Sequence, residues 1–212
     1  MTPYYEHAGI TIYHGDCREV ADEWRGIRTK AFDLLLTDPP YGLGDRWQGG
    51  TWATDPMYAD AMKWDEKLPD GDIVEMLTLA RYAIIWGGNY YHLPPSRCWL
   101  AWVKSSQMAT MADFELAWTS FDRPAKLLRE DRNADGKRWH PTQKPESLMR
   151  WALMQAPADV KTLLDPFMGS GTTLVAAKRL GRQAVGIERE ERYCEIAAKR
   201  LAQEVLPLEQ LA

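Results

Sequence analysis

The sequence predicts an α/β domain with a doubly wound, mostly parallel sheet. Short, continuously apolar runs, such as residues 32–37 and 162–165, are typical of strands that helices bury on both faces. Helical patterns alternate with these runs, which favours strand–helix–strand units. A glycine turn at residues 169–171 joins one strand to the next helix. The 212 residues, 45% of them hydrophobic, suffice for a single domain, residues 1–212, with a sizeable core.

The first half of the chain begins with an alternating, β-branched stretch that predicts a strand, and a turn and a short helical pattern follow it. Asp72 is a suitable N-cap for the second helix, and a glycine pair ends the strand after that helix. The predicted strands are 9–13, 32–37 and 83–86, and the predicted helices are 18–24 and 73–82.

The second half begins with two strand-like runs separated by a polar stretch, which predict an antiparallel hairpin at one edge of the sheet. Pro145 opens the next helix, because proline is favoured at the first helical position. The predicted strands are 98–103, 114–119, 162–165 and 183–187, and the predicted helices are 146–156, 172–180 and 190–205.

The sequence Asp38-Pro39-Pro40-Tyr41 directly follows the strand at 32–37. Ligands bind at the carboxyl ends of strands in open α/β sheets, so this rigid turn presents a carboxylate and an aromatic ring where chemistry is expected. Asp38 and the Pro39 carbonyl can accept the two N–H groups of an exocyclic base amine, and Tyr41 can stack on the base. A proline turn with a capping aspartate is the plainer alternative.

The glycine turn is typical of a nucleotide site. Gly169 and Gly171 let the backbone approach a ligand, and Glu188 ends the next strand, where a carboxylate can hold a ribose diol. Such a turn also fits a dinucleotide. However, Thr172 and Thr173 stand where a third glycine would open the helix, which makes a pyrophosphate site less convincing.

Two segments are candidate loops for nucleic-acid contact, residues 43–71 and 120–139. The first is rich in Gly, Trp and Asp without clear periodicity, as in many functional loops. In the second, basic residues outnumber acidic ones, which indicates contact with phosphates or, alternatively, a solvated linker. The candidates for phosphate contact are Arg123, Lys126, Arg129, Arg132, Lys137 and Arg138.

The overall composition restricts the class of protein. A formal net charge of −4 means that any surface for nucleic acid must be local. Three widely spaced cysteines argue against a disulfide framework or a zinc site and fit a reducing cytoplasm. Since no targeting pattern or membrane-length apolar stretch is present, we expect a cytoplasmic protein with no membrane association and no metal.

Three segments together resemble one family. Residues 37–42 (TDPPYG), 140–145 (HPTQKP) and 165–173 (DPFMGSGTT) are similar to motifs of the amino-directed DNA methyltransferases that use S-adenosylmethionine. The catalytic motif precedes the cofactor motif, as in the circularly permuted β-group. The resemblance implies a Rossmann-like methyltransferase fold, in which the amino-terminal strand completes the sheet after the last helix.

The same resemblance implies roles for individual residues. Asp38, Pro39 and Tyr41 grip the target base, whereas Glu188 binds the ribose of the cofactor. Lys144 lies against the methionine carboxylate, unless it is a solvated lysine beside a helix start. The implied cofactor-binding residues are Asp16, Cys17, Asp38, Thr142, Gln143, Lys144, Asp165, Phe167, Gly169, Gly171, Thr172 and Glu188.

Asp16, with the Cys17 backbone, is implied at the adenine of the cofactor, and a plain N-cap aspartate is the alternative. The implied reaction is methylation of N6 of adenine in flipped DNA, of the restriction–modification type, and N4 of cytosine is the alternative. RNA adenine and protein glutamine are further acceptors that the same grip would serve. From other classes, a catalytically silent cofactor- or DNA-binding subunit and an NAD-dependent oxidoreductase are the rivals.

The chain departs from the family between the last strands of the sheet and residue 140. Members that read a sequence carry a sizeable recognition region there, and here only residues 120–139 are available. We therefore expect a short or relaxed recognition site, with DNA contact shared by the two candidate loops and compatible with a homodimer.

Overall fold

The computed structural model describes residues 2–25, 30–43, 65, 68–105, 112–136, 139 and 142–203. The strands are β1 Tyr5–His7, β2 Ile10–His14, β3 Phe32–Thr37, β4 Ala80–Trp86, β5 Trp99–Lys104, β6 Phe114–Thr119, β7 Lys126–Glu130, β8 Thr162–Asp165 and β9 Gln183–Glu188. The α-helices are α1 Cys17–Arg25, α3 Asp70–Met76, α4 Glu146–Met154, α5 Thr172–Arg179 and α6 Glu191–Ala202, and the 3-10 helices are η3 Leu77–Leu79 and η4 Gly88–Tyr90.

All the strands of the described part belong to one sheet, in the order β1-β2-β9-β8-β3-β4-β6-β5-β7. The neighbours from β2 to β4 in this order run parallel, which is the doubly wound arrangement. β1 pairs antiparallel with β2, and β6 pairs antiparallel with both β4 and β5. The predicted α/β fold with a mostly parallel sheet is therefore confirmed.

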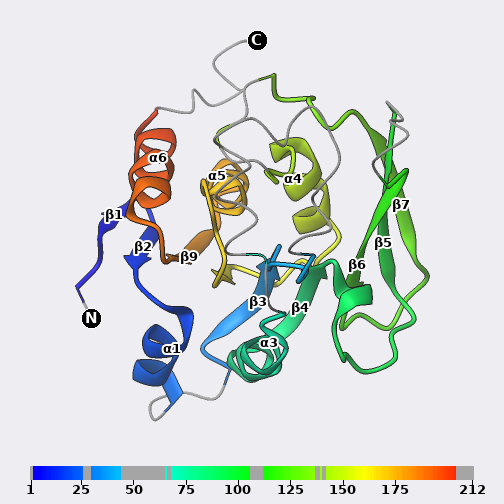
Figure 1. The fold of residues 1–212 in the computed structure, drawn as a ribbon, viewed down its shortest axis with the longest axis horizontal. Coiled ribbons are helices and arrows are strands. Elements are labelled where there is room, and N and C mark those ends of the chain that lie inside the picture. The colour runs from blue at the N-terminus through cyan, green and yellow to red at the C-terminus, as the bar shows by residue number, and fades with distance from the viewer. Residues whose placement is uncertain are drawn as a thin grey trace.

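Helices cover both faces of the sheet (Figure 1). α4, α5 and α6 lie on one side of it, and α1 and α3 lie on the other. Along β4, Ile84 and Trp86 pack into the core beneath the first group, whereas Ala83 and Ile85 pack into the core of the second. This alternation follows from the two-residue period of a strand, and it explains why the central strands are apolar throughout.

The amino-terminal strand lies where the permuted order requires it. β2 is parallel to β9 and in register from Ile10 with Ala184 to His14 with Glu188. The first part of the chain therefore continues the sheet where the last part leaves it. The turn after β2 consequently lies beside the end of β9.

The predicted helix over 73–82 is wrong in its second half. α3 ends at Met76, and after η3 the chain enters β4 at Ala80, which pairs with Phe32 of β3. Parallel pairing with a buried neighbour outweighs the local helical pattern. Asp72 is not the N-cap either, since Pro69 holds that position and Asp72 lies in the first turn of the helix.

The hairpin of β5 and β6 forms as predicted, but it is not the edge of the sheet. β7 pairs parallel with β5 on its outer side, from Leu100 with Lys126 to Lys104 with Glu130. The segment 120–139, expected as a loop, thus contains a strand, and β1 is a further strand that the sequence analysis missed. Most of the other candidate loop, 43–71, lies outside the described residues.

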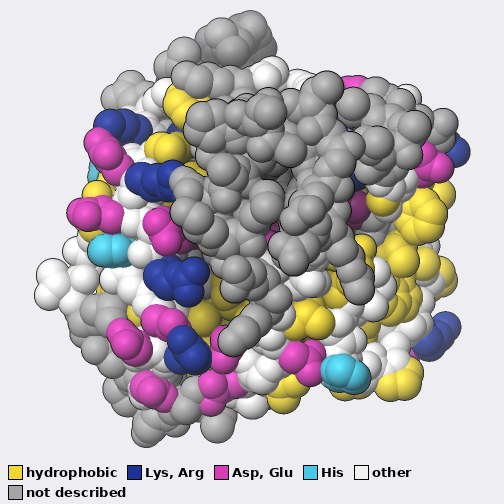
Figure 2. Space-filling view, viewed as in Figure 1, with side chains coloured by type: hydrophobic (Ala, Val, Ile, Leu, Met, Phe, Trp, Pro, Cys, Tyr) yellow, Lys and Arg dark blue, Asp and Glu magenta, His cyan; other side chains and the backbone are white. Residues whose placement is uncertain are grey.

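The outer side of the sheet near β7 carries apolar as well as basic side chains. Leu127 on β7 is 61% exposed and Phe114 on β6 is 53% exposed. Figure 2 shows apolar side chains gathered on the side of the molecule that carries β5, β6 and β7. In the part of the chain that the structure describes, no helix is both long and apolar enough to cross a membrane.

Candidate active site

β3 and β8 are adjacent parallel strands, so the two sequence motifs that follow them meet at one edge of the sheet. Leu34 pairs with Leu163 and Leu35 with Leu164. At the carboxyl ends, the Thr37 hydroxyl donates a hydrogen bond of 2.8 Å to Asp165 Oδ1. The Asp38 tetrapeptide and the glycine turn are therefore two halves of one site, although more than 120 positions separate them.

Asp38 is held by two donors. The Tyr41 hydroxyl donates to Asp38 Oδ1 at 2.6 Å. Lys144 Nζ donates to both carboxylate oxygens, at 2.9 Å to Oδ1 and 2.8 Å to Oδ2. The Tyr91 hydroxyl donates to the Pro40 carbonyl, which ties the turn to the chain beyond η4. The tetrapeptide is thus a fixed element of the site.

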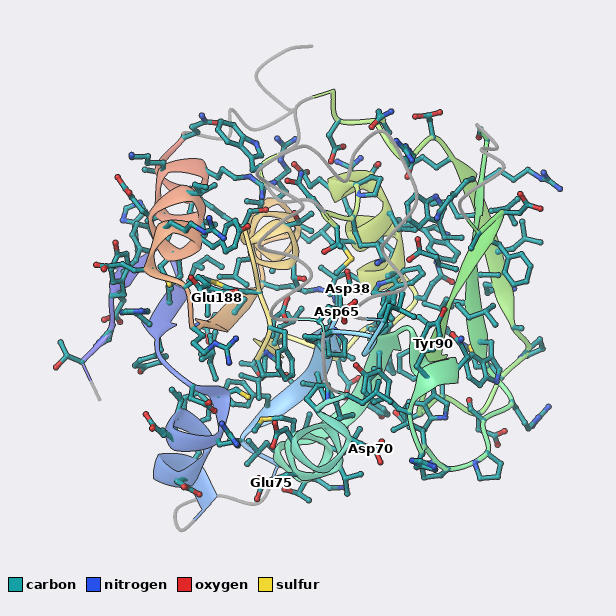
Figure 3. The ribbon with its side chains drawn as sticks, in the orientation of Figure 1. Asp38, Asp65, Asp70, Glu75, Tyr90 and Glu188 are labelled. Atoms are coloured by element: carbon teal, nitrogen blue, oxygen red, sulfur yellow. The ribbon has the colours of Figure 1, made fainter. Side chains whose placement is uncertain are left out.

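Asp65 closes the turn that follows the tetrapeptide. The Gly42 backbone N–H donates to Asp65 Oδ1 at 2.8 Å, and the Leu43 N–H lies 3.4 Å from Oδ2. Asp65 is only 1% exposed, and it lies next to Asp38 in Figure 3. Gly42 has φ +66°, so a left-handed residue makes the turn possible. Asp65 therefore fixes where the chain leaves the site.

Lys144 is part of a buried chain of charges. Its Nζ lies 2.9 Å from Glu115 Oε2, an ion pair that lacks the angles of a hydrogen bond. Lys104 Nζ lies 2.7 Å from Glu115 Oε1. The side chain of Lys144 is 6% exposed and that of Asp38 19% exposed. Two carboxylates and two ammonium groups therefore alternate from the end of β5 to the tetrapeptide.

The pKa values follow this arrangement. Burial raises the pKa of Asp38 above its usual value, although Lys144 opposes the rise. Burial would lower the pKa of Lys144, but Asp38 and Glu115 outweigh it, so that the pKa is raised. Burial would likewise raise the pKa of Glu115, yet Lys144 and Lys104 bring it down to about 2. Lys144 and Glu115 therefore stabilise each other's charged forms, and Lys144 favours the carboxylate form of Asp38 against the effect of burial.

Tyr41 is enclosed by aromatic and backbone groups. Its ring lies 5.0 Å from that of Tyr90, stacked at an interplanar angle of 21°. A side chain at Gly87 would collide with the Tyr41 ring, since an added Cβ would lie 2.1 Å from Cε1. Tyr90 is 41% exposed, so one stacking partner of Tyr41 is accessible from outside.

The glycine turn is organised by backbone geometry and by Glu188. Gly169 has φ +52° and Gly171 has φ +78°, both in the left-handed region. An added Cβ on Gly171 would lie 2.7 Å from Ala197 Cβ, so this glycine allows α6 to pack closely. Glu188 Oε2 accepts the Gly169 N–H at 3.0 Å, and Oε1 accepts the Glu190 N–H at 2.8 Å. Burial raises the pKa of Glu188, with the Glu190 N–H opposing it.

Asp165 lies at the start of the glycine turn, and no basic side chain contacts it among the residues that the structure describes. Besides Thr37, the Phe167 N–H donates to its Oδ1 at 3.2 Å. Burial raises the pKa of Asp165 to about 7, and hydrogen bonds from Thr173 and Thr37 oppose the rise. Thr172 begins α5 and is buried. Asp165 thus holds the strand end and the turn together.

Asp16 and Cys17 lie beside Glu188, because the Gly15 N–H donates to the Glu188 carbonyl at 3.0 Å. Asp16 Oδ1 accepts the Arg18 N–H at 2.9 Å, which is the capping role that the sequence left as an alternative. A hydrogen bond from the Arg18 side chain lowers the pKa of Asp16 to about 2. Cys17 is buried. The Asp16–Cys17 turn therefore lies beside the end of β9, and its role at the adenine of a cofactor stays a prediction.

Of the HPTQKP-like segment, the structure describes residues 142–145, and His140 and Pro141 lie outside the described residues. Gln143 Oε1 accepts the Ser170 hydroxyl at 3.2 Å and the Trp139 N–H at 2.8 Å, so it links this segment to the glycine turn. Thr142 is partly buried. Lys144 departs from the expectation: its ammonium is directed to Asp38 and Glu115 instead of standing free for a cofactor carboxylate.

Four of the six predicted phosphate-contact residues lie in the part of the chain that the structure describes. Arg123 donates to the Gln155 carbonyl, and its guanidinium lies 4.9 Å from the Phe121 ring centroid, so it has a structural role. Lys126 and Arg129 are exposed on β7. Arg132 is partly buried, and Lys137 and Arg138 lie outside the described residues. Among the residues that the structure describes, there is no cluster of three or more metal-ligating side chains.

Sequence reasoning missed Glu115, Lys104, Asp65 and Tyr90. Glu115 alone had a signal, because it is an acid inside the otherwise apolar run of residues 114–119. A charge in a strand that packs centrally in a sheet needs a partner, which the sequence does not identify.

A sheet with this permuted order, a carboxylate tetrapeptide and a glycine turn at neighbouring strand ends define a Rossmann-like group-transfer enzyme. Residues 86–199 match the protein family described as DNA methylase, of the N6/N4 type. The chain is 52% identical to the type II methyltransferase M2.LlaDCHI of Lactococcus lactis subsp. cremoris, across 94% of this chain and 91% of that one. It therefore belongs to the N6/N4 DNA methylase family, as the motifs indicated.

Other curated relatives match over shorter stretches, and in two of them the chain covers only 20% and 24% of their length. The fold is also that of solved structures. The M1.HpyAVI–SAM complex matches with a TM-score of 0.61 and 23% identity, covering 92% of this chain and 100% of that one. The cytosine-N4-specific PvuII DNA methyltransferase matches with a TM-score of 0.63 and 16% identity, covering 99% and 92%.

Proposed function

We propose that this DNA methylase transfers a methyl group from S-adenosylmethionine to N6 of adenine in DNA. The observation that carries the proposal is the meeting of Asp38 and the glycine turn at the ends of β3 and β8, joined by the Thr37–Asp165 hydrogen bond. One motif suits a base amine and the other a ribose-containing donor, so neither half alone would support methyl transfer.

The residues around the glycine turn fit the cofactor. The Glu188 carboxylate accepts backbone N–H groups from Gly169, Arg189 and Glu190, and as a carboxylate with several lone pairs it suits the two ribose hydroxyls. The Asp16–Cys17 turn beside it is available for the adenine, and Asp165, Phe167 and the turn itself for the methionine part. S-adenosylmethionine supplies an activated methyl group on a positively charged sulfur.

The tetrapeptide prepares the acceptor. The lone pair of an aromatic amine is delocalised into the ring, so Asp38 and the Pro39 carbonyl accept its two N–H groups and favour a localised lone pair. A carboxylate is too weak a base to remove the proton first, so Asp38 orients the amine and then accepts the proton. Holding the amine in near-attack geometry provides most of the rate enhancement.

The base has to leave the duplex to reach Asp38, at a cost of a few kcal/mol that stacking and pocket hydrogen bonds offset. The ring of Tyr90 is stacked on Tyr41 and is accessible. A base that stacks on this face of Tyr41 displaces Tyr90. Tyr90 therefore belongs to the entry path of the base.

The decisive experiment is transfer of a labelled methyl group from S-adenosylmethionine to duplex DNA, single-stranded DNA and RNA, followed by digestion and identification of the nucleoside. N6-methyladenine in DNA is the expected product. N4-methylcytosine is the second candidate, which the fold shared with the cytosine-N4-specific PvuII enzyme supports. Cofactor binding without transfer to any acceptor would instead indicate a silent partner subunit.

DNA contact by the basic segment is a further part of the proposal. Lys126 and Arg129 are exposed on β7. Replacing both with alanine is expected to weaken duplex binding several-fold. The slope of the logarithm of the binding constant against the logarithm of the salt concentration should fall in magnitude by about one for each lost phosphate contact. Lys199→Ala on α6 is the matched control, since Lys199 is 73% exposed and its ion-pair partner is Glu195 on the same helix. If the salt dependence of duplex binding did not change, we would conclude that β7 does not contact DNA.

A short or relaxed recognition site remains our proposal. The alignment with M2.LlaDCHI extends over 258 residues, more than the 212 of this chain, so that relative has internal residues that this chain lacks. Few side chains are then available to read base edges. Sequencing of methylated positions in mixed genomic DNA tests this, and a long, strict motif would contradict it.

A homodimer also remains a proposal, and sedimentation with and without DNA tests it. All three cysteines, Cys17, Cys98 and Cys194, are buried and free. Free thiols fit a reducing compartment, so we propose that the enzyme acts in the cytoplasm.

A further inference from the structure

The contacts of Lys144 assign it to the tetrapeptide. Its ammonium has three N–H donors, and four oxygens surround it: both oxygens of Asp38, the Tyr41 hydroxyl at 3.0 Å and Glu115 Oε2. No donor is left for a cofactor carboxylate. This arrangement is a built feature, because the side chain is 6% exposed and its oxygen partners come from two separate segments of the chain, the tetrapeptide and β6.

We propose that Lys144 is a positioning residue that turns the Asp38 carboxylate toward the target amine, and that Glu115, itself paired with Lys104, fixes Lys144. The inference rests on the proposed methyl transfer. It goes beyond it by giving a role to a lysine of the cofactor-side segment and to a glutamate of β6.

The hydrogen bonds of Asp38 show how the orientation arises. Oδ1 accepts from both Tyr41 and Lys144, which fills its two lone-pair directions. Among the residues that the structure describes, Lys144 is the donor to Oδ2, which leaves one lone-pair direction of that oxygen for a substrate N–H. The open direction is where an amine N–H can bind, so Lys144 and Tyr41 together select the oxygen that meets the substrate.

Glu115 keeps the charge of Lys144 paired when the proton of the amine moves to Asp38. After methyl transfer, the N–H bond of the methylated amine breaks, its electron pair stays on nitrogen, and the proton forms an O–H bond at Asp38 Oδ2. Asp38 is then neutral, and Lys144 would be an unpaired buried cation without Glu115. A buried charge that loses its partner costs several kcal/mol. Because Glu115 keeps Lys144 paired, the free-energy cost of protonating Asp38 is smaller.

The titration of Asp38 is set by the groups that face it from each packed element. The cation is Lys144 from the segment before α4, and Glu115 on β6 is the nearest second carboxylate. The remaining titratable groups that interact with Asp38 are Tyr41, Tyr91 and Asp165. Lys144 stabilises the carboxylate form and Glu115 opposes it, so removing each one has an opposite effect.

The test compares Lys144→Met with Glu115→Gln in methyl transfer to DNA across pH. Lys144→Met keeps the apolar stem, and it is expected to lower kcat by about tenfold to a hundredfold through loss of alignment. It should also shift the acid limb of kcat to higher pH, since Asp38 is then protonated more readily. Glu115→Gln should shift the acid limb to lower pH. The cofactor Kd, measured by calorimetry with S-adenosylmethionine, should stay within about twofold in both.

Lys199→Met is the matched control and should leave kcat, the acid limb and the cofactor Kd unchanged. A Lys144→Met enzyme with full kcat and weaker binding of S-adenosylmethionine would overturn the proposal. Lys144 would then be a cofactor-binding residue. Acid limbs that move in the same direction in both variants would also overturn it. If Lys144→Met fails to fold, the direction of the shift in Glu115→Gln decides alone.

A measurement without substrate separates this inference from the proposed function. Carbon-13 NMR of labelled aspartates follows the Asp38 carboxyl, assigned from Asp38→Asn, in the wild type and both variants. The midpoint should rise in Lys144→Met and fall in Glu115→Gln. Failure of the wild type to methylate any DNA would count against the proposed function alone, whereas unmoved midpoints would count against the role of Lys144.

Discussion

Asp38 and Asp165 are aspartates at the ends of neighbouring parallel strands, yet the protein surrounds them differently. Asp38 faces the ammonium of Lys144 and the hydroxyl of Tyr41. Asp165 receives hydrogen bonds from neutral groups, the Thr37 hydroxyl and the Phe167 N–H. Burial raises the pKa of both, but only Asp38 has a cation in contact to oppose it.

The difference fits the two roles proposed for these carboxylates, one that meets the substrate amine and one that holds structure. A carboxyl group accepts hydrogen bonds from an amine best in its charged form, and the contact with Lys144 favours that form in Asp38. A group that joins two loop ends can accept hydrogen bonds without being fully ionised at neutral pH. Similar positions in the sheet therefore do not imply similar chemistry.

The largest effect is expected from Asp38→Ala. Loss of the group that orients the amine and takes its proton should reduce kcat by about 10²- to 10⁴-fold. The cofactor Kd should remain near that of the wild type, because the glycine turn is untouched. Single-turnover transfer of labelled methyl to duplex DNA, with calorimetry on the same sample, measures both. A fully active variant would remove Asp38 from the mechanism.

Asp165→Asn should change the pH dependence of stability. The pKa of Asp165 is about 7 in the folded protein and about 4 in the unfolded chain. Between these values the folded state binds the extra proton, so wild-type stability falls as pH rises, by up to about 1.4 kcal/mol per pH unit for this group. The variant should lack this fall. Urea unfolding at a series of pH values between 4 and 7 measures it.

Asp159→Asn is the control for that experiment, because Asp159 is 56% exposed and its ion pair is with Arg81, which is itself 43% exposed. Parallel curves for Asp165→Asn and the wild type between pH 4 and 7 would contradict the raised pKa. Parallel curves would also mean that Asp165 does not differ from Asp38 in its protonation as proposed.

The smallest of the three effects is expected from Glu188→Ala. Loss of hydrogen bonds to the ribose should weaken the cofactor Kd about tenfold to a hundredfold, equivalent to about 1.4–2.7 kcal/mol. At saturating cofactor, kcat should change much less than in Asp38→Ala. Calorimetry with S-adenosylmethionine is the measurement, and an unchanged Kd would contradict the ribose assignment.

The sequence allowed the glycine-turn half of the site to be predicted because that half is local. Gly169, Gly171 and Thr172 lie within four residues, and Glu188 ends the next strand along the chain. Their contacts follow from the backbone of one strand–turn–helix–strand unit. The two central strands β3 and β8 were likewise evident, since burial on both faces leaves an apolar run.

The other half could not be predicted in full, because it is assembled from distant segments. Lys144 meets Asp38 across 106 positions, and the contact of Glu115 depends on the pairing of β6 with β4 and β5. The hairpin of β5 and β6 could be predicted from the sequence, but the pairing of β6 with β4 could not. The helix expected over 73–82 failed for the same reason, since pairing of β4 with β3 decides the state of Ala80 and its neighbours.

The Asp65 contact joins two points of the chain that are 23 positions apart at the mouth of the tetrapeptide. Because loop-closure entropy grows only slowly with the number of residues between two joined points, a longer or shorter sequence between them is expected to change the free energy of this contact by little. The position of Asp38 is therefore expected to depend on the Gly42–Asp65 contact more than on the length of the sequence between them.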